Sequence, residues 1–137
     1  QMDHGNYSKS FKVNDREPVE INPIDAKNKG LKNGDIVKLF NDRGACLAGV
    51  KIDEKVMQGV AQISTGAWYD PQNPLEYGSI CKHGNPNILT RDKGTSKLGQ
   101  GPIAHSCLIE MEKYNDKPPK VTAHEPPVII RLDESLN

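Results

Sequence analysis

Two neighbouring apolar segments of this chain are separated by a short polar turn. Asp35–Phe40 (DIVKLF) and Ala45–Ile52 (ACLAGVKI) are rich in branched apolar residues, which predicts two β-strands. The sequence NDRG at residues 41–44 predicts a hairpin turn between them, with Gly44 free to adopt a positive φ.

Two further strands are expected later in the chain. A turn at residues 56–59 leads into the first, from Val60 to Ser64. In the second, from Ser106 to Lys113, the apolar residues Cys107, Ile109 and Met111 alternate with polar ones, which predicts one buried face and one exposed face. Short strands with few helices indicate a mainly β protein and suggest a small β-barrel.

One helix is predicted after Asn22, in the sequence PIDAKNKG. Asn22 can cap the free amide groups, Pro23 suits the first helical position, and Asp25 lies in the positively polarised first turn. Gly30 can adopt the left-handed conformation that ends a helix, and Leu31 can then fold back onto it. The helix is barely two turns long, so we expect packing to stabilise it.

Residues 66–101 form a long stretch with almost no apolar periodicity. A loop of this length is usually either functional or disordered. Disorder fits poorly, because six large apolar side chains in the stretch call for burial. These are Trp68, Tyr69, Ile80, Ile88, Leu89 and Leu98. We therefore expect an ordered loop that binds a ligand through backbone groups and amide side chains.

Length and charge limit the classes of function. The chain has 137 residues, which fits one domain, and its 18 basic residues balance 18 acidic ones. No overall field therefore favours nucleic acid or an anionic membrane, and no apolar run approaches the ~20 residues of a membrane span. Three cysteines form an odd set, which indicates reduced thiols. A start at Gln1 within a polar stretch is expected of a piece of a larger protein.

Three parts are predicted along the chain. Residues 1–16 are an expected extended lead-in, residues 17–114 are the folded body, and residues 115–137 are a proline-rich tail. The apolar run Val128–Ile130 near the end suits either an edge strand or a contact with a neighbouring domain.

Four segments of the body carry a resemblance to a known family. They are FNDRG, GAWYDP, NPNILT and GTSKLGQG, in that order. Together they resemble the C-terminal molybdopterin-guanine-dinucleotide-binding domain of the dimethyl sulfoxide reductase family, in the subgroup of trimethylamine N-oxide and biotin sulfoxide reductases.

The resemblance implies both a fold and a function. The fold is a six-stranded double-psi β-barrel that covers one side of a bis(molybdopterin guanine dinucleotide) molybdenum cofactor. The whole enzyme would reduce N-oxides or S-oxides by oxygen-atom transfer, with the remaining domains as partners of this one. The protein ligand to molybdenum is a serine on another domain, so no catalytic residue is expected here and the isolated fragment is expected to be inactive.

Carboxamide side chains are the candidate cofactor contacts. A pterin edge alternates donors and acceptors, and Asn or Gln can pair with it without adding charge. Asn85, Asn87 and Gln100 are candidates beside glycines, and Thr90 can bond the same ligand or its pyrophosphate. The resemblance places Asn87 and Gln100 at family contact positions. The alternative is that Asn85 and Asn87 only stabilise turns around Pro86.

Two more residues are candidates at the cofactor cleft. Trp68 is expected mainly as a core anchor whose indole N–H bonds a carbonyl, and lining the cleft is compatible with that role. Gln1 matches the last residue of the family's His-Ser-Gln segment, whose His and Ser are absent here.

Two other classes of function remain open. Cys81 with His83, and His105 with Cys107, each offer two ligands in one short segment, which could form a small zinc site. The one-residue gaps are tighter than usual zinc spacings, so no metal ligand is assigned. A double-psi barrel that serves only as a protein-interaction module also fits the fold, but it leaves GTSKLGQG unexplained.

Overall fold

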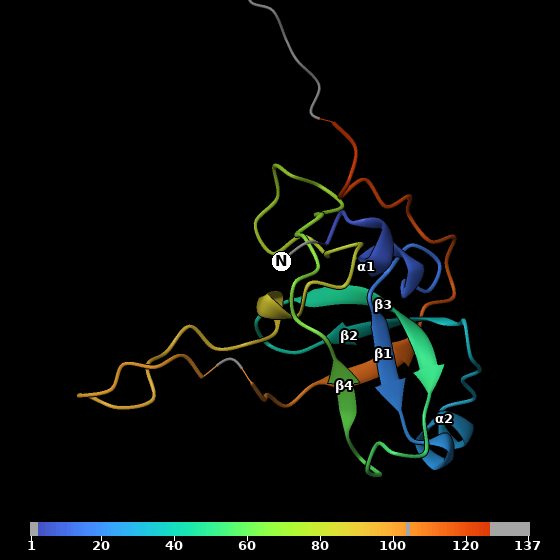
Figure 1. Cartoon of the computed structure of the whole chain (residues 1–137), viewed down its shortest axis with the longest axis horizontal. Coiled ribbons are helices and arrows are strands. Elements are labelled where there is room, and N and C mark those ends of the chain that lie inside the picture. The colour runs from blue at the N-terminus through green and yellow to red at the C-terminus, as the bar shows by residue number, and fades with distance from the viewer. Residues whose placement is uncertain (1–2, 104, 127–137) are drawn as a thin grey trace, which may run out of the picture.

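The computed structural model describes residues 3–103 and 105–126, and Figure 1 shows its elements. In this part of the chain the helices are α1 (Asn6–Ser10), α2 (Pro23–Asn28) and the single-turn 3-10 helix η1 (Pro86–Ile88). The strands are β1 (Pro18–Ile21), β2 (Ile36–Phe40), β3 (Ala45–Ile52), β4 (Ala61–Ile63) and β5 (Glu110–Lys113).

The strands form one mixed sheet in the order β4-β1-β3-β2-β5. β1 runs parallel to β3, and the other neighbours are antiparallel. The predicted mainly β class is confirmed. The closed six-stranded barrel is not, because the described strands form an open five-stranded sheet with β4 and β5 at its edges.

The last strand is shorter than predicted. Its first paired residue is Glu110, opposite Phe40 at the end of β2. The chain turns immediately after Phe40, so β2 offers no residue with which residues 106–109 can pair. Cys107, Ile109 and Met111 still pack against the core, as the alternation predicted.

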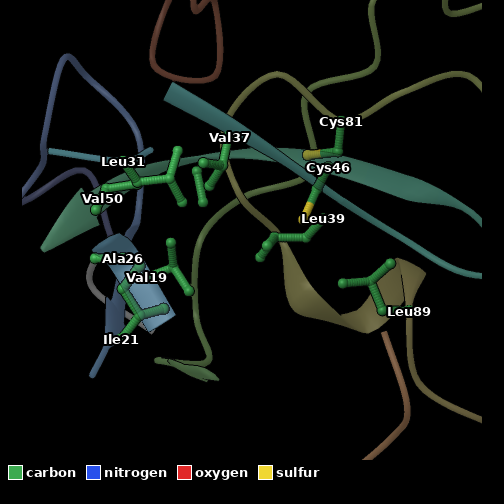
Figure 2. Packing of buried hydrophobic residues seen from close by; sticks show 11 residues of the cluster. Val19, Ile21, Ala26, Leu31, Val37, Leu39, Cys46, Val50, Cys81 and Leu89 are labelled. Atoms are coloured by element: carbon green, nitrogen blue, oxygen red, sulfur yellow. The ribbon is translucent and has the colours of Figure 1, made fainter. Parts of the chain in front are cut away.

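The core lies between the sheet, α2 and the loop around η1 (Figure 2). Residues from β1, β2 and β3 supply its centre, and burial of such apolar side chains is the main stabilising contribution. Ala26 and Leu31 cover it near α2, and Leu89 covers it after η1 (Figure 2). The central side chains are Val19, Ile21, Val37, Leu39, Cys46, Ala48 and Val50, and Cys81 of the long loop packs against them.

The local signals around α2 are confirmed. The Asn22 side chain accepts a hydrogen bond of 2.9 Å from the Ile24 N–H, which caps the helix. Gly30 adopts a φ of 64°, and the N–H of buried Leu31 returns to the Ala26 carbonyl at 2.8 Å. Short-range chemistry thus sets both ends of this helix.

Two local expectations are wrong. The lead-in is not extended throughout, because α1 occupies residues 6–10. The 41–44 turn forms, with the Asn41 N–H bonded to the Gly44 carbonyl at 3.0 Å, but Gly44 does not have a positive φ. Glycine is required there for another reason: a Cβ at Gly44 would clash with Ile88.

The long loop is folded back on itself at two places. Near its start, Pro71 and Cys81 form a β-bridge, and the Lys82 N–H bonds the Asp70 carbonyl at 2.8 Å. We call this paired region, residues 70–71 with 81–82, the neck of the loop. Further along, a bridge between Gly94 and Pro102 closes an arm of residues 93–103, which projects away from the sheet (gold in Figure 1).

Burial in this loop follows the expectation only in part. Leu89 is buried at 2% exposure, but Trp68, Tyr69 and Leu98 are 40%, 52% and 98% exposed.

None of the helices in the described residues has the length and hydrophobicity needed to span a bilayer.

Candidate functional site

A surface hollow of about 480 Å³ lies beside η1, and two of the predicted contacts line it. Asn85 and Asn87 share this hollow with Arg43 from the β2–β3 turn and with Tyr69 and Tyr77 from the loop. Asn85 and Asn87 therefore lie at the same hollow.

The two asparagines differ in what their side chains do. Asn85 Oδ1 accepts a hydrogen bond of 2.9 Å from the Asn87 N–H and so caps η1. The Asn87 carboxamide is exposed and, within the described residues, makes no hydrogen bond of its own. The turn-stabilising alternative therefore fits Asn85, whereas Asn87 keeps a full donor and acceptor set for a ligand.

Thr90 lies near Asn87 but opens onto a different hollow. Its hydroxyl donates to the Asn87 carbonyl at 3.2 Å, which holds the turn after η1. The side chain also lines a second hollow of about 500 Å³, with Leu89 and Cys107.

Arg43 is a cation whose place in the hairpin turn favours a surface or turn-bonding role over that of a phosphate clamp when the sequence alone is considered. Its Nε donates to the Leu89 carbonyl at 2.7 Å, and Nη1 lies 2.8 Å from Asp42 Oδ1. These contacts fix the guanidinium next to η1, where a second set of N–H groups suits an anionic oxygen. Its position beside Asn87 arises from tertiary packing of the hairpin on η1, which no local signal reveals.

Gln100 lies elsewhere, in the projecting arm. Its Nε2 donates to the Lys97 carbonyl at 3.2 Å, and its backbone has a φ of 48°. A non-glycine residue with positive φ is uncommon and is often found at a functional turn. The structure does not bring Gln100 to the hollow of Asn85 and Asn87.

Trp68 is not the predicted core anchor. The residue is 40% exposed, and its ring packs against two imidazoles, with centroid distances of 5.2 Å to His4 and 5.5 Å to His124. The indole N–H has no hydrogen-bond partner among the described residues, whereas the backbone N–H donates to Asp3 Oδ2 at 3.1 Å. Gln1 and the run Val128–Ile130 lie outside the described residues.

A buried charge cluster under Trp68 was not predicted. Asp3, at 3% exposure, accepts from Lys12 Nζ at 2.6 Å and from His124 Nε2 at 2.9 Å. Burial alone would raise the pKa of Asp3, but the hydrogen bonds from Lys12, His124 and the Trp68 amide outweigh it and hold the pKa far below its ordinary value. The carboxylate is therefore ionised in the folded protein.

The same cluster fixes a buried histidine. His83 is fully buried, and its Nδ1 lies 3.0 Å from the Trp68 carbonyl and 3.6 Å from Asp3 Oδ2. Because a carbonyl oxygen only accepts, Nδ1 must carry the proton, which leaves Nε2 without a partner among the described residues. Burial holds the pKa of His83 below its ordinary value, so the ring is neutral.

Asp3, His83 and His124 offer ligand atoms within 4.8 Å of one another, as a metal site does. Two features oppose a cation there: Nδ1 of His83 carries a proton and donates it to the Trp68 carbonyl, so it has no lone pair for a metal, and the Lys12 ammonium already neutralises Asp3. The set Cys81, His83, His105 and Cys107 considered for zinc does not form a ligand group in the described residues. No sequence motif could have revealed this cluster, because its members are separated by up to 121 positions.

Comparisons with known proteins now define the class. The family model described as "Molydopterin dinucleotide binding domain" matches residues 1–108. The chain belongs to this family.

Individual relatives show which proteins of this family the chain is similar to. The chain is 51% identical over 112 residues to "Trimethylamine-N-oxide reductase 1" of Escherichia coli (strain K12), which covers 82% of this chain and 13% of the relative. It is 49% identical over 118 residues to "Trimethylamine-N-oxide reductase" of Salmonella typhimurium, covering 86% and 14%. The protein of the same name from Vibrio parahaemolyticus is 47% identical over 121 residues, covering 88% and 15%.

The chain thus spans about one seventh of the length of these relatives. Among solved structures, acetylene hydratase from Pelobacter acetylenicus is similar in fold, with a TM-score of 0.56 at 18% identity. That match covers 72% of this chain and 14% of the other. The resemblance stated from the sequence is confirmed.

Proposed function

We propose that this chain is the cofactor-binding domain of a larger molybdenum oxidoreductase that reduces N-oxides or S-oxides by oxygen-atom transfer. The observation that carries the proposal is the match of the dinucleotide-binding family model to residues 1–108. The names of the relatives support the substrate class. The remaining domains of the parent enzyme are the partners of this one, and the isolated domain is inactive.

The residues in the described hollow fit a bis(molybdopterin guanine dinucleotide) group. Asn87 presents an unengaged carboxamide, which matches the donor and acceptor edge of a pterin. Arg43, fixed beside it, matches the charge of a pyrophosphate. Asn85 and Thr90 act on the ligand through the shape they give to η1, because both bond the backbone of Asn87.

Gln100 and Trp68 would contact the same extended group from other sides. A dinucleotide is long, so the arm that carries Gln100 can bind a part of it that the hollow does not. Trp68, with its half-exposed ring, lines the cleft. Gln1 remains a proposed contact from the sequence resemblance.

When bound, the group supplies the redox-active metal that accepts the oxygen atom. This chain's own residues bind and orient the organic part of the group and exclude water from it. Protein in cofactor enzymes commonly contributes binding, orientation and electrostatics rather than the redox chemistry. No catalytic residue is proposed within the chain.

The family's six-stranded double-psi barrel is also proposed for this domain. The candidate sixth strand is the segment around Cys81, which forms a parallel bridge to Cys46. Its N–H donates to the Ala45 carbonyl at 3.0 Å, and its carbonyl accepts from the Leu47 N–H at 2.8 Å. These two bonds extend the edge of β3 beyond its pairing with β1.

The function is tested in the parent enzyme loaded with cofactor. We expect it to oxidise a reduced dye with trimethylamine N-oxide, dimethyl sulfoxide or biotin sulfoxide as the acceptor. A loaded enzyme that uses none of the three contradicts the proposed substrate class. Purified enzyme without molybdenum or a pterin contradicts the proposed cofactor.

A further inference from the structure

The segment Pro119–His124 lies outside the residues that the family model matches, yet it makes several buried contacts. After β5 the chain runs back toward the end of the molecule that holds α1 (orange to red in Figure 1). On the way, the Pro119 carbonyl accepts a hydrogen bond of 2.5 Å from Nη2 of buried Arg16. The tail is therefore attached to the body by specific polar contacts.

Thr122 makes the central contact, at the neck of the long loop. Its backbone N–H donates to Asp70 Oδ2 at 2.7 Å, and its hydroxyl donates to Asp70 Oδ1 at 2.7 Å. The same hydroxyl accepts from Lys82 Nζ at 2.8 Å. The side chains of Asp70 and Lys82 are only 7% and 10% exposed, and their charged ends are 3.2 Å apart.

These bonds favour the ionised form of the Asp70 carboxyl. Burial alone would raise the pKa of Asp70, but the hydrogen bonds from Thr122 and Lys82 lower it below its ordinary value. An ionised carboxylate buried to this degree depends on every donor it has. Losing the Thr122 hydroxyl would leave both Asp70 and Lys82 short of a partner.

The two residues that Thr122 joins come from the two limbs of the loop. Asp70 lies on the limb that carries Trp68, and Lys82 lies on the limb that leads to Asn85 and Asn87. Two positions beyond Thr122, His124 donates to Asp3, the residue that also accepts the Trp68 N–H. The His124 ring packs edge-on against Trp68 at a centroid distance of 5.5 Å.

We infer that Pro119–His124 is a clasp: it joins the two limbs of the loop at Asp70 and Lys82 and holds the Trp68 ring in position for the cofactor. Thr122 and His124 are positioning residues that act through Asp70, Lys82 and Asp3. The consequence for the cofactor rests on the proposed function. The mechanical role of the clasp does not.

The test compares three variants of the full 137-residue chain. Thr122→Val removes the hydroxyl at nearly constant volume, Thr122→Ser keeps it, and Lys120→Ala is the matched control. Lys120 lies in the same segment, but its side chain is 80% exposed and pairs only with Glu125 in the described residues. Amide hydrogen exchange and the emission of Trp68, the single tryptophan, are the readouts.

With Thr122→Val, exchange at Trp68, Gln72 and Lys82 should rise about tenfold, the effect expected when one hydrogen bond to a charged group is lost. Exchange in β2 and β3 should stay unchanged, and Trp68 emission should shift to longer wavelength. Thr122→Ser should restore both readouts, and Lys120→Ala should alter neither.

Two results would overturn the clasp. Exchange that stays unchanged at the neck shows that Thr122 holds nothing there. Exchange that rises equally in β2 and β3 shows that Thr122 supports the whole fold rather than the loop. If Thr122→Val does not fold, His124→Ala replaces it, and unchanged Trp68 exchange and emission in that variant overturn the proposal.

The link to the cofactor is read separately, as molybdenum content in the parent enzyme. Faster amide exchange in a variant whose parent enzyme keeps its full molybdenum content supports the clasp but shows that it has no effect on the cofactor. A wild-type parent without molybdenum contradicts the proposed function and leaves the exchange result standing.

Discussion

Gly44 lies directly against Ile88, in a contact that leaves no room for a side chain. A Cβ at Gly44 would lie 2.6 Å from Ile88 Cγ1 and 3.1 Å from the Ile88 carbonyl oxygen. The β2–β3 hairpin and η1 thus meet through a bare backbone position. This contact places Arg43 next to Asn87.

Gly44→Ala should therefore destabilise the protein and displace η1. Overpacking of this kind typically costs about 1–3 kcal/mol. The free energy of unfolding in urea measures the loss. Gly101→Ala is the control, because its Cβ would meet only Thr95 Oγ1 at 3.5 Å. Equal free energies of unfolding for the two variants would show that η1 can move away from the new methyl group without loss of stability.

Asn87→Ala should weaken cofactor retention in the parent enzyme without destabilising this domain. A buried ligand group that loses its partner costs about 1–3 kcal/mol, which is roughly a 5- to 150-fold loss of affinity. Molybdenum content after purification and thermal stability are the two measurements. Gln100→Ala should behave alike, and Lys9→Ala, at an exposed position of α1, should change neither.

Asn85→Ala should differ from Asn87→Ala in the unliganded domain. Asn85 caps η1, and loss of such a cap typically costs about 0.5–2 kcal/mol. The free energy of unfolding should therefore fall for Asn85→Ala alone. A cost as large for Asn87→Ala would mean that its carboxamide is structural.

Stability should decline as the pH falls, in two steps. The folded pKa of His83 is below the ordinary value of 6.5, so the unfolded chain binds the extra proton and stability is lost as the pH falls through 6.5. Asp3 and Asp70 also have lowered pKa values, and their contribution is lost below about 3.8, the ordinary value.

Unfolding free energies measured from pH 8 to pH 2 test this order. His83→Gln should abolish the first step, since the buried ring that faces Asp3, Lys12 and His124 no longer titrates. His105→Gln, at an exposed position, should keep it. A first step that persists in His83→Gln would assign it to another group.

The cysteines should differ in reactivity. Burial raises the pKa of the Cys46 thiol to about 12, and Cys81 is fully buried as well, whereas Cys107 is partly exposed. The thiolate is the reactive form, so alkylation at pH 8 should modify Cys107 first. Mass spectrometry after a timed reaction would show this. Rapid modification of Cys46 in the folded protein would contradict its burial.

The sequence alone determined the elements whose signals are local. The Asn22 cap, Pro23 and Gly30 lie within one short segment and define α2 at both ends. The hairpin of β2 and β3 follows from two branched segments and a four-residue turn, because adjacent antiparallel strands need no distant partner. The family resemblance also rested on contiguous residues, which the family model then matched.

Tertiary structure decided the features that join distant residues. Thr122 bonds Asp70 across 52 positions, and His124 bonds Asp3 across 121, and neither pairing leaves a periodic pattern in the chain. Trp68 was expected as a core anchor whose indole N–H bonds a carbonyl. It is instead 40% exposed, and its ring contacts the imidazoles of His4 and His124, two residues far from it in the sequence.

The same division separates the candidate site residues. Carboxamide chemistry made Asn87 a candidate from the sequence, and the family resemblance placed it at a contact position, because both depend on the residue and its neighbours in the chain. Its unengaged side chain, the capping role of Asn85 and the approach of Arg43 depend on how η1 packs on the hairpin. Packing against distant segments is a property of the folded chain, so only the structure could supply it.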